Sequence, residues 1–273
     1  MVRAAMLAAE HEAKLEIVHV APSVDRYALK RLGFDKLAGR DPDPPLRHQL
    51  DEAVALARSH NVTPTTKLTK GGAASKLVQE AERFGADLVV VGARGERSIK
   101  DAVIGTTAER LMERLSRDIL VVRAAPKAAY DTVLICVALG PVSCFVVRSA
   151  ISLSTQARLH MLHAFEPLFE TKLVSHGAAS ETIRSHRLAA KREAAQALHT
   201  FLEQCVLPSD RHVATMLRRG NPPHEILIAA AHLRAGVIAV GKNQSAVEEF
   251  FLGSATKHII RVASSDVLIS AAH

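Results

Sequence analysis

The chain repeats itself, and this repetition constrains its fold more than any other feature of the sequence. The stretch Gly71–Gly92 spans 21 steps, and Gly220–Gly241 spans the same 21 at an offset of 149 residues (241 − 92). Each stretch reads as a glycine, an amphipathic helix, a short apolar strand and a second glycine. Two copies of one domain are the simplest explanation. We therefore predict two domains, residues 1–126 and residues 127–273.

Within each copy, short apolar segments alternate with helical ones. In the second copy, residues 132–137 form a continuous apolar run of strand length. Short, β-branched strands that alternate with helices are typical of a parallel sheet covered on both faces. We therefore predict an α/β fold built from two repeated Rossmann-like domains. The second copy is predicted to have strands at 132–137, 160–164, 213–217, 237–240 and 267–270, and helices at 142–155, 181–205, 223–233 and 253–262.

The first copy has no counterpart of the run at residues 132–137. Residues 2–11 are rich in alanine and leucine, which favour helix, and no apolar strand precedes them. We expect either that the natural start lies upstream or that another segment fills the gap. A short linker at residues 123–130 joins the copies. The first copy is predicted to have strands at 15–20, 64–68, 88–91 and 119–122, and helices at 2–11, 46–60, 73–84 and 106–115.

One segment of the first copy is suited to phosphate. Gly92 ends a buried strand, Gly95 lets the chain turn away, and Gly105 opens a helix whose free amides and positive dipole end favour an anion. Thr106 and Thr107 add hydroxyl groups. The intervening loop also carries three cations: Arg94, Arg97 and Lys100. Turn and helix-cap glycines with no ligand are the structural alternative for these positions.

Together with the repeat and the order of elements, this segment resembles the universal stress protein family. The nucleotide signature of that family is G-x2-G-x9-G-[S/T], which Gly92, Gly95, Gly105 and Thr106 match position by position. The resemblance covers nearly the whole chain as a tandem pair. It implies that each copy is an adenine nucleotide alpha hydrolase-like domain, with a five-stranded parallel sheet of order 3-2-1-4-5. It also implies an ATP ligand, carried with Mg²⁺.

The resemblance implies a binding site in the first copy that lacks one part. ATP-binding members also use an Asp at the end of the first strand, and this copy has neither that strand nor its Asp. In the family order that strand is central, so its loss leaves strands 15–20 and 88–91 without their shared neighbour, which exposes main-chain groups. The residues implied to bind nucleotide are Val20, Val91, Gly92, Arg94, Gly95, Gly105, Thr106 and Thr107.

The second copy keeps its first strand but has lost most of the signature. Ala138 stands where the Asp is expected, Gln244 replaces the second glycine, and Ala164 replaces the Val at the end of the second strand. We therefore expect this copy to bind no ATP, or to bind it very weakly. What is left of the signature is Gly241, Gly253 and Ser254.

The cysteines and histidines do not suggest a metal centre. The three cysteines include no C-x-x-C pair, so we expect neither a disulfide framework nor a zinc module, and a reduced, cytoplasmic protein. Cys136 and Cys144 lie in or beside apolar runs and are expected to be small core residues. His160 and His163 lie three apart on a strand, so they point to opposite faces. No metal site and no catalytic residue is predicted.

Membranes and nucleic acids are not expected partners. The longest apolar run, residues 133–147, is shorter than the ~20 residues that span a membrane. The first ten residues are too short an apolar stretch for a signal peptide. The net charge of +7 favours anionic ligands, but the basic residues are spread along the chain and aromatic residues make up only 4%.

These features predict a regulatory protein of the stress response that binds an adenine nucleotide in its first copy. A nucleotide-free scaffold is one alternative, and an enzyme of the related adenine-binding group, such as a weak ATPase, is another. The basic helix at residues 181–205 is a candidate surface for a protein partner, and homodimers are a further expectation. The last strands, 119–122 and 267–270, fall at sheet edges, which favours their pairing across a pseudo-two-fold axis.

Overall fold

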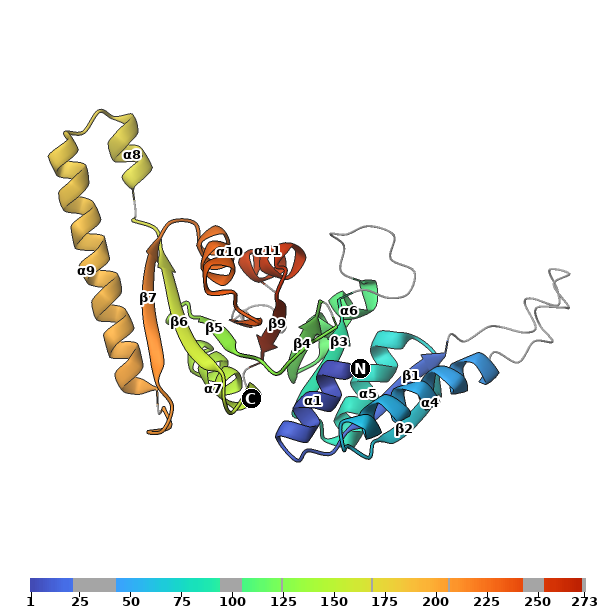
Figure 1. Cartoon of the computed structure of the whole chain (residues 1–273). Helices are drawn as coiled ribbons and strands as arrows, with labels where there is room; N and C mark the ends of the chain where they lie inside the picture. The colour runs from blue at the N-terminus through green and yellow to red at the C-terminus, as the bar shows by residue number, and fades with distance from the viewer. Residues whose placement is uncertain are drawn as a thin grey trace, which may run out of the picture.

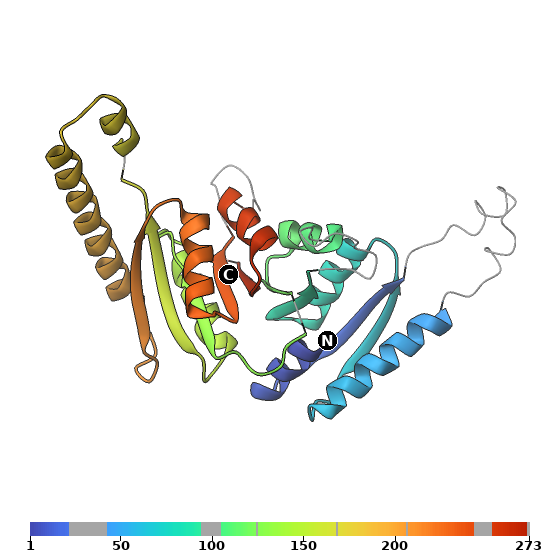
Figure 2. The same ribbon diagram turned by 45° about the horizontal axis from the view of Figure 1, so that its top comes forward.

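A computed structural model describes residues 1–21, 43–93, 105–123, 125–167, 169–205, 207–242 and 253–271. Both halves are α/β, and their sheets meet in the middle of the molecule (Figures 1 and 2). The first half contains α1 (Val2–Glu10), β1 (Glu16–Ala21), α4 (Asp43–Ser59), β2 (Thr65–Lys70), α5 (Ala73–Phe84), β3 (Leu88–Gly92), α6 (Thr106–Arg114) and β4 (Asp118–Val122). The second contains β5 (Thr132–Cys136), α7 (Ser143–Leu153), β6 (Arg158–Phe165), α8 (Glu170–Ser175), α9 (Ser180–Gln204), β7 (Val213–Arg219), α10 (Pro222–Leu233), β8 (Val237–Gly241), α11 (Ser254–Val262) and β9 (Asp266–Ser270).

The second half forms the complete parallel sheet that the family resemblance implies. Its strands lie in the order β9-β8-β5-β6-β7, which is 5-4-1-2-3 within that half, and every neighbouring pair is parallel. All five residues of β5 are buried, as expected for a central strand with helices on both faces. Helix α10 begins at Pro222, where a proline fits the first turn without losing a hydrogen bond. The predicted fold class is confirmed.

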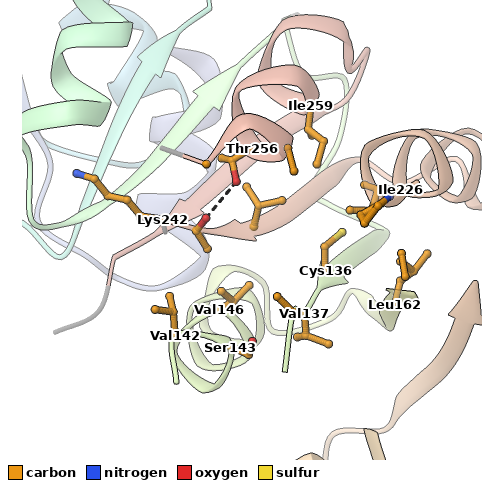
Figure 3. Close-up of a pocket in the computed structure, with 17 residues that line it drawn as sticks. Cys136, Val137, Val142, Ser143, Val146, Leu162, Ile226, Lys242, Thr256 and Ile259 are labelled. Carbon is orange, nitrogen blue, oxygen red and sulfur yellow. Dashed lines mark hydrogen bonds between the residues drawn. The ribbon is translucent and has the colours of Figure 1, made fainter. Parts of the chain in front are cut away.

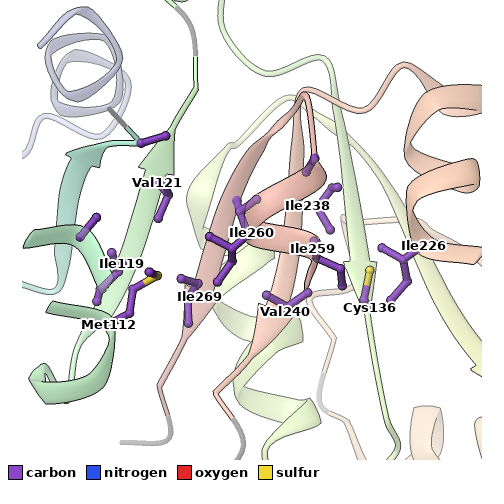
Figure 4. Packing of buried hydrophobic residues seen from close by; sticks show 14 of the residues in the cluster. Met112, Ile119, Val121, Cys136, Ile226, Ile238, Val240, Ile259, Ile260 and Ile269 are labelled. Carbon is purple, nitrogen blue, oxygen red and sulfur yellow. The ribbon is translucent and has the colours of Figure 1, made fainter. Parts of the chain in front are cut away.

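Two apolar layers cover the faces of this sheet. Helices α5, α6, α10 and α11 contribute to one buried cluster, and α1, α7 and α9 contribute to the other. Alternate residues of β4 point to opposite faces of the sheet. Ile119 and Val121 therefore pack in the first cluster, and Leu120 packs in the second. Figure 4 shows how the first cluster continues from β4 of one half to β9 of the other. The two halves therefore share a hydrophobic core.

The halves join by strand pairing. β4 and β9 are antiparallel, with Leu120 opposite Leu268, so the edge strands of the two copies complete one seven-stranded sheet. Asp118 and Asp266 close the two ends of this pair in the same way. Asp266 accepts a hydrogen bond of 2.8 Å from the Arg123 amide, and Asp118 accepts one of 2.9 Å from the Ala271 amide. The expected pseudo-two-fold pairing is present.

In the part of the chain that the structure describes, the first half has no strand in the central place of the repeat, as the sequence predicted. β1 and β2 form a separate two-stranded sheet, while β3 is the last strand of the seven-stranded sheet. In the ranges that the structure describes, no strand pairs with β1 or β3 on the side that faces the gap. A cavity of about 660 Å³ lies beside it, lined by α1, by the segment before β1 and by β3.

Helix α1 also binds the second half. The Arg3 guanidinium lies 3.7 Å from the centre of the Tyr130 ring and donates to the Ala128 carbonyl at 2.9 Å. The Glu10 carboxylate accepts from the Thr155 amide at 2.8 Å, which lowers the pKa of Glu10 despite partial burial. These contacts hold the first helix against the pseudo-two-fold interface.

Candidate functional site

The predicted phosphate segment begins at the end of a strand and resumes at the start of a helix. Gly92 is the last residue of β3, and the Ala93 amide continues the ladder by donating to the Val122 carbonyl at 2.8 Å. The Gly105 amide donates to the Ala93 carbonyl at 3.1 Å, which brings the two ends of the loop together. Gly105 has an extended backbone, with φ −63° and ψ 140°, and is the N-cap of α6.

The amides in the first turn of α6 could bind an anion. Within the part of the chain that the structure describes, no side chain caps the helix and no acceptor faces the amides of Thr106 and Thr107. Thr106 is exposed and Thr107 is half-buried. Glu109 is in the same turn, and its Oε1 lies 3.7 Å from an Nη atom of Arg261, whose positive charge offsets that of the carboxylate. A helix N-terminus with free amides is suited to phosphate.

The structure brings together only some of the predicted site residues. Two of them, Val91 and Gly92, lie at the carboxyl end of β3. Three more lie at the N-terminus of α6: Gly105, Thr106 and Thr107. Val20 belongs to β1 in the separate two-stranded sheet, where it pairs with Thr69. The loop residues that the sequence singled out lie outside the described residues: Arg94, Gly95, Arg97 and Lys100.

The second half has a cavity at the equivalent place. It has a volume of about 240 Å³ and lies at the carboxyl ends of β5 and β8, against the start of α11 (Figure 3). Its walls are mainly apolar, and the Thr256 hydroxyl is turned to the Gly241 carbonyl at 3.2 Å. The position suits a ligand of a parallel α/β sheet. Among the described residues, its lining carries no carboxylate and a single cation, Lys242.

Val142, the N-cap of α7, and Val146 of that helix pack against the strand-end glycine of this cavity. A Cβ atom on Gly241 would lie 3.1 Å from the Val142 Cγ1 and 3.1 Å from the Val146 Cγ2. Real Cβ contacts are rarely so short, so a larger residue at this position would require the two valines to shift. The two valines occupy the space on the Cβ side of Gly241, which also lines the cavity. This packing fits the expectation of a degenerate second site, which stays a prediction.

Lys242 is a buried cation that the sequence reasoning did not single out. It is 4% exposed and points away from the cavity toward the first half (Figure 3). Its Nζ donates to the carbonyls of Glu113 and Leu115, at 3.4 and 3.1 Å, where α6 ends. A cation at a helix C-terminus complements the dipole, but burial is the larger effect and lowers the pKa of Lys242 to about 8. Its only signal in the sequence is its place directly after a strand-end glycine.

The lowered pKa of Lys242 predicts a stability that rises with pH. Its pKa is about 8 in the folded chain, against the ordinary 10.5. Between these values the unfolded chain binds more protons, so the free energy of unfolding increases with pH. From pH 7.5 to 9.5 we expect the native chain to gain on the order of 1 kcal/mol relative to Lys242→Met, measured by urea unfolding. The exposed Lys67→Met is the control, and equal pH profiles for all three chains would contradict the prediction.

The described residues form neither a metal centre nor a membrane-spanning helix. Among the residues with defined placement, no group of three or more His, Cys, Asp or Glu side chains could hold a metal ion. Across the same residues, no helix is both long enough and apolar enough to cross a membrane.

Comparison with known proteins gives matches in both halves. Residues 2–123 and 129–270 each match the model of the universal stress protein family. The chain is 27% identical over 126 residues to universal stress protein G of Escherichia coli O157:H7, covering 45% of this chain and 86% of that protein. It is 25% identical over 123 residues to universal stress protein A homolog 2 of Coxiella burnetii, covering 44% and 82%.

A solved structure matches the whole chain. It is a universal stress protein from Archaeoglobus fulgidus, with a TM-score of 0.68 and 13% identity, covering 99% of this chain and 92% of the other. At this identity the match concerns the fold. It agrees with two α/β repeats that share one sheet.

Proposed function

This chain belongs to the universal stress protein family through both of its halves, and we propose that it is a cytoplasmic regulatory protein of the stress response that binds one adenine nucleotide in its first half. The observation that carries the proposal is the open N-terminus of α6. It lies near the carboxyl end of β3, because the Gly105 amide donates to the Ala93 carbonyl. Its first amides face no acceptor in the described chain. Phosphate groups are the part of a nucleotide that such amides bind.

The residues present fit the phosphates better than the rest of the nucleotide. Thr106 and Thr107 supply amides and hydroxyl groups, and Gly92 leaves room for close approach at the strand end. The counterpart of the family's first-strand Asp is absent, and Val20 lies in a separate sheet. We therefore expect the phosphates to dominate the affinity. Mg²⁺ would accompany ATP and neutralise part of its charge.

The proposed regulation runs through α6. Its N-terminus would hold phosphate, while its C-terminal carbonyls accept hydrogen bonds from Lys242 of the second half. Glu109 of its first turn lies near Arg261 of α11. A ligand that binds better to one position of α6 would shift the population of that position. The surface around α6 and α11 would then differ between the bound and the free protein, and a partner could distinguish them.

Calorimetric titration of the intact chain tests this function. With ATP and Mg²⁺ we expect one site per chain, competition by inorganic tripolyphosphate, and no measurable heat of binding for adenosine. These three results follow if α6 recognises the phosphates, because tripolyphosphate offers its amides an anion and adenosine does not. A chain that binds none of the three favours the nucleotide-free scaffold. Two ATP sites per chain would contradict a degenerate second half.

A further inference from the structure

Two cysteines that are far apart in the sequence are in contact. The Sγ atoms of Cys144 and Cys205 lie 2.6 Å apart, although 61 positions separate the residues. Cys144 is in the first turn of α7, and Cys205 is the C-cap of α9. Neither cysteine forms a disulfide in the structure. A disulfide has an S–S distance of about 2.05 Å, so the pair needs to approach by only about half an ångström.

The contact is held by the surrounding packing. The Cys205 amide donates to the Phe201 carbonyl at 3.0 Å, which fixes the end of α9. Phe201 and Leu198 of that helix pack in the same buried cluster as Val147 of α7. Both helices are therefore fixed against the same face of the sheet, and their thiols meet as a result of the fold.

The two thiols differ in access. Cys144 is half-buried, whereas Cys205 is 9% exposed. Burial and the neighbouring Cys144 thiol raise the pKa of Cys205 to about 12. A reagent in solution therefore reaches Cys144 first.

We propose that Cys144 and Cys205 are a reversible oxidation site, at which a small disulfide oxidant such as oxidised glutathione converts the two thiols to an intramolecular disulfide. The Cys144 thiolate attacks one sulfur of the oxidant, forms a mixed disulfide and releases one reduced glutathione. The Cys205 sulfur, after losing its proton to water, attacks the Cys144 sulfur and releases the second. The protein loses two protons and two electrons, and the oxidant takes them up and becomes two thiols.

The disulfide would tie α7 to the end of α9. Val142, the N-cap of α7, and Val146 of that helix line the second-half cavity beside Gly241. The disulfide would therefore also restrict the movement of this side of the cavity. Crosslinking residues this far apart restricts the unfolded chain and stabilises the fold. Disulfides in reducing compartments are typically transient and redox-sensing, which agrees with a protein otherwise expected to be reduced.

Intact-mass measurement after treatment with oxidised glutathione tests the site. We expect the native chain to lose about 2 Da, with the Cys144 and Cys205 peptides linked, and its unfolding midpoint to rise by about 5 °C. Dithiothreitol should reverse both changes. Cys136→Ala is the matched control, because Cys136 is buried without a sulfur contact in the described chain, and it should behave like the native protein.

Variants of the pair complete the test. Cys144→Ser and Cys205→Ala should each lose the 2 Da change, and Cys205→Ala should stop at a mixed disulfide on Cys144. Circular dichroism checks that each variant is folded. A native chain that stays fully reduced, that accumulates only mixed disulfide, or that links Cys136 instead would overturn the proposal. Because no nucleotide is added, the outcome is independent of the ATP titration.

Discussion

Replacing Gly105 with aspartate is expected to weaken ATP binding by about 30-fold or more while the chain stays folded. Gly105 is an N-cap with extended backbone, a conformation that aspartate adopts readily at this position. Its carboxylate would accept from the first amides of α6, the same donors that the phosphates need, and would repel them. Loss of one charge-assisted interaction of about 2 kcal/mol corresponds to this factor. Equilibrium dialysis with labelled ATP measures the affinity.

Gly253→Asp is the matched control for this variant. Gly253 is the N-cap of α11, with φ −56° and ψ 152°, and stands 148 positions after Gly105 in the equivalent place of the second half. The substitution adds the same carboxylate to a helix that we expect to bind no nucleotide. Its ATP affinity should equal that of the native chain. If Gly253→Asp lost binding and Gly105→Asp kept it, the assignment of the site to the first half would be wrong.

Replacing Asp266 with alanine is expected to lower the free energy of unfolding by about 3–5 kcal/mol. Asp266 is 6% exposed and accepts hydrogen bonds from the Tyr130 hydroxyl at 2.6 Å and the Arg123 amide at 2.8 Å. It also lies 3.5 Å from Arg3, which is itself buried. Its removal would leave a buried guanidinium without its carboxylate and two further donors without their acceptor. Chemical unfolding followed by circular dichroism gives the value.

Asp118→Ala provides the comparison within the same molecule. Asp118 occupies the equivalent position at the other end of the β4–β9 pair and accepts from the Ala271 amide, but it is only half-buried. We expect a loss of about 1–2 kcal/mol. Equal losses for the two variants would contradict the importance of the buried Arg3–Tyr130–Asp266 cluster.

The sequence predicted the fold because local patterns and the repeat agree. The apolar run that became β5 has the length and composition of a buried strand, the family resemblance implied its central place, and Pro222 marked the start of a helix. The repeat then predicted which strand the first half lacks, and among the described residues β1 and β2 form a sheet of their own. The short helix α8, at residues 170–175, was not predicted, because six residues carry too little periodicity.

The site was predicted only in part, because its missing features depend on contacts between distant residues. The sequence does not show whether a phosphate or a valine side chain lies beside Gly241. The structure shows Val142 and Val146 there. Lys242 is an ordinary lysine in the sequence, and its burial against the end of α6 is a property of the pseudo-two-fold interface. Cys144 was predicted to be a small core residue; it is half-buried, with its sulfur against that of Cys205.

A crystal structure of the chain with a non-hydrolysable ATP analogue and Mg²⁺ tests the assignment of the nucleotide to one half most directly. We predict phosphate density within hydrogen-bond distance of the Thr106 and Thr107 amides, and none beside Gly241, where Val142 and Val146 pack. Phosphate density at the start of α11, with the first turn of α6 filled by the protein's own groups, would contradict it.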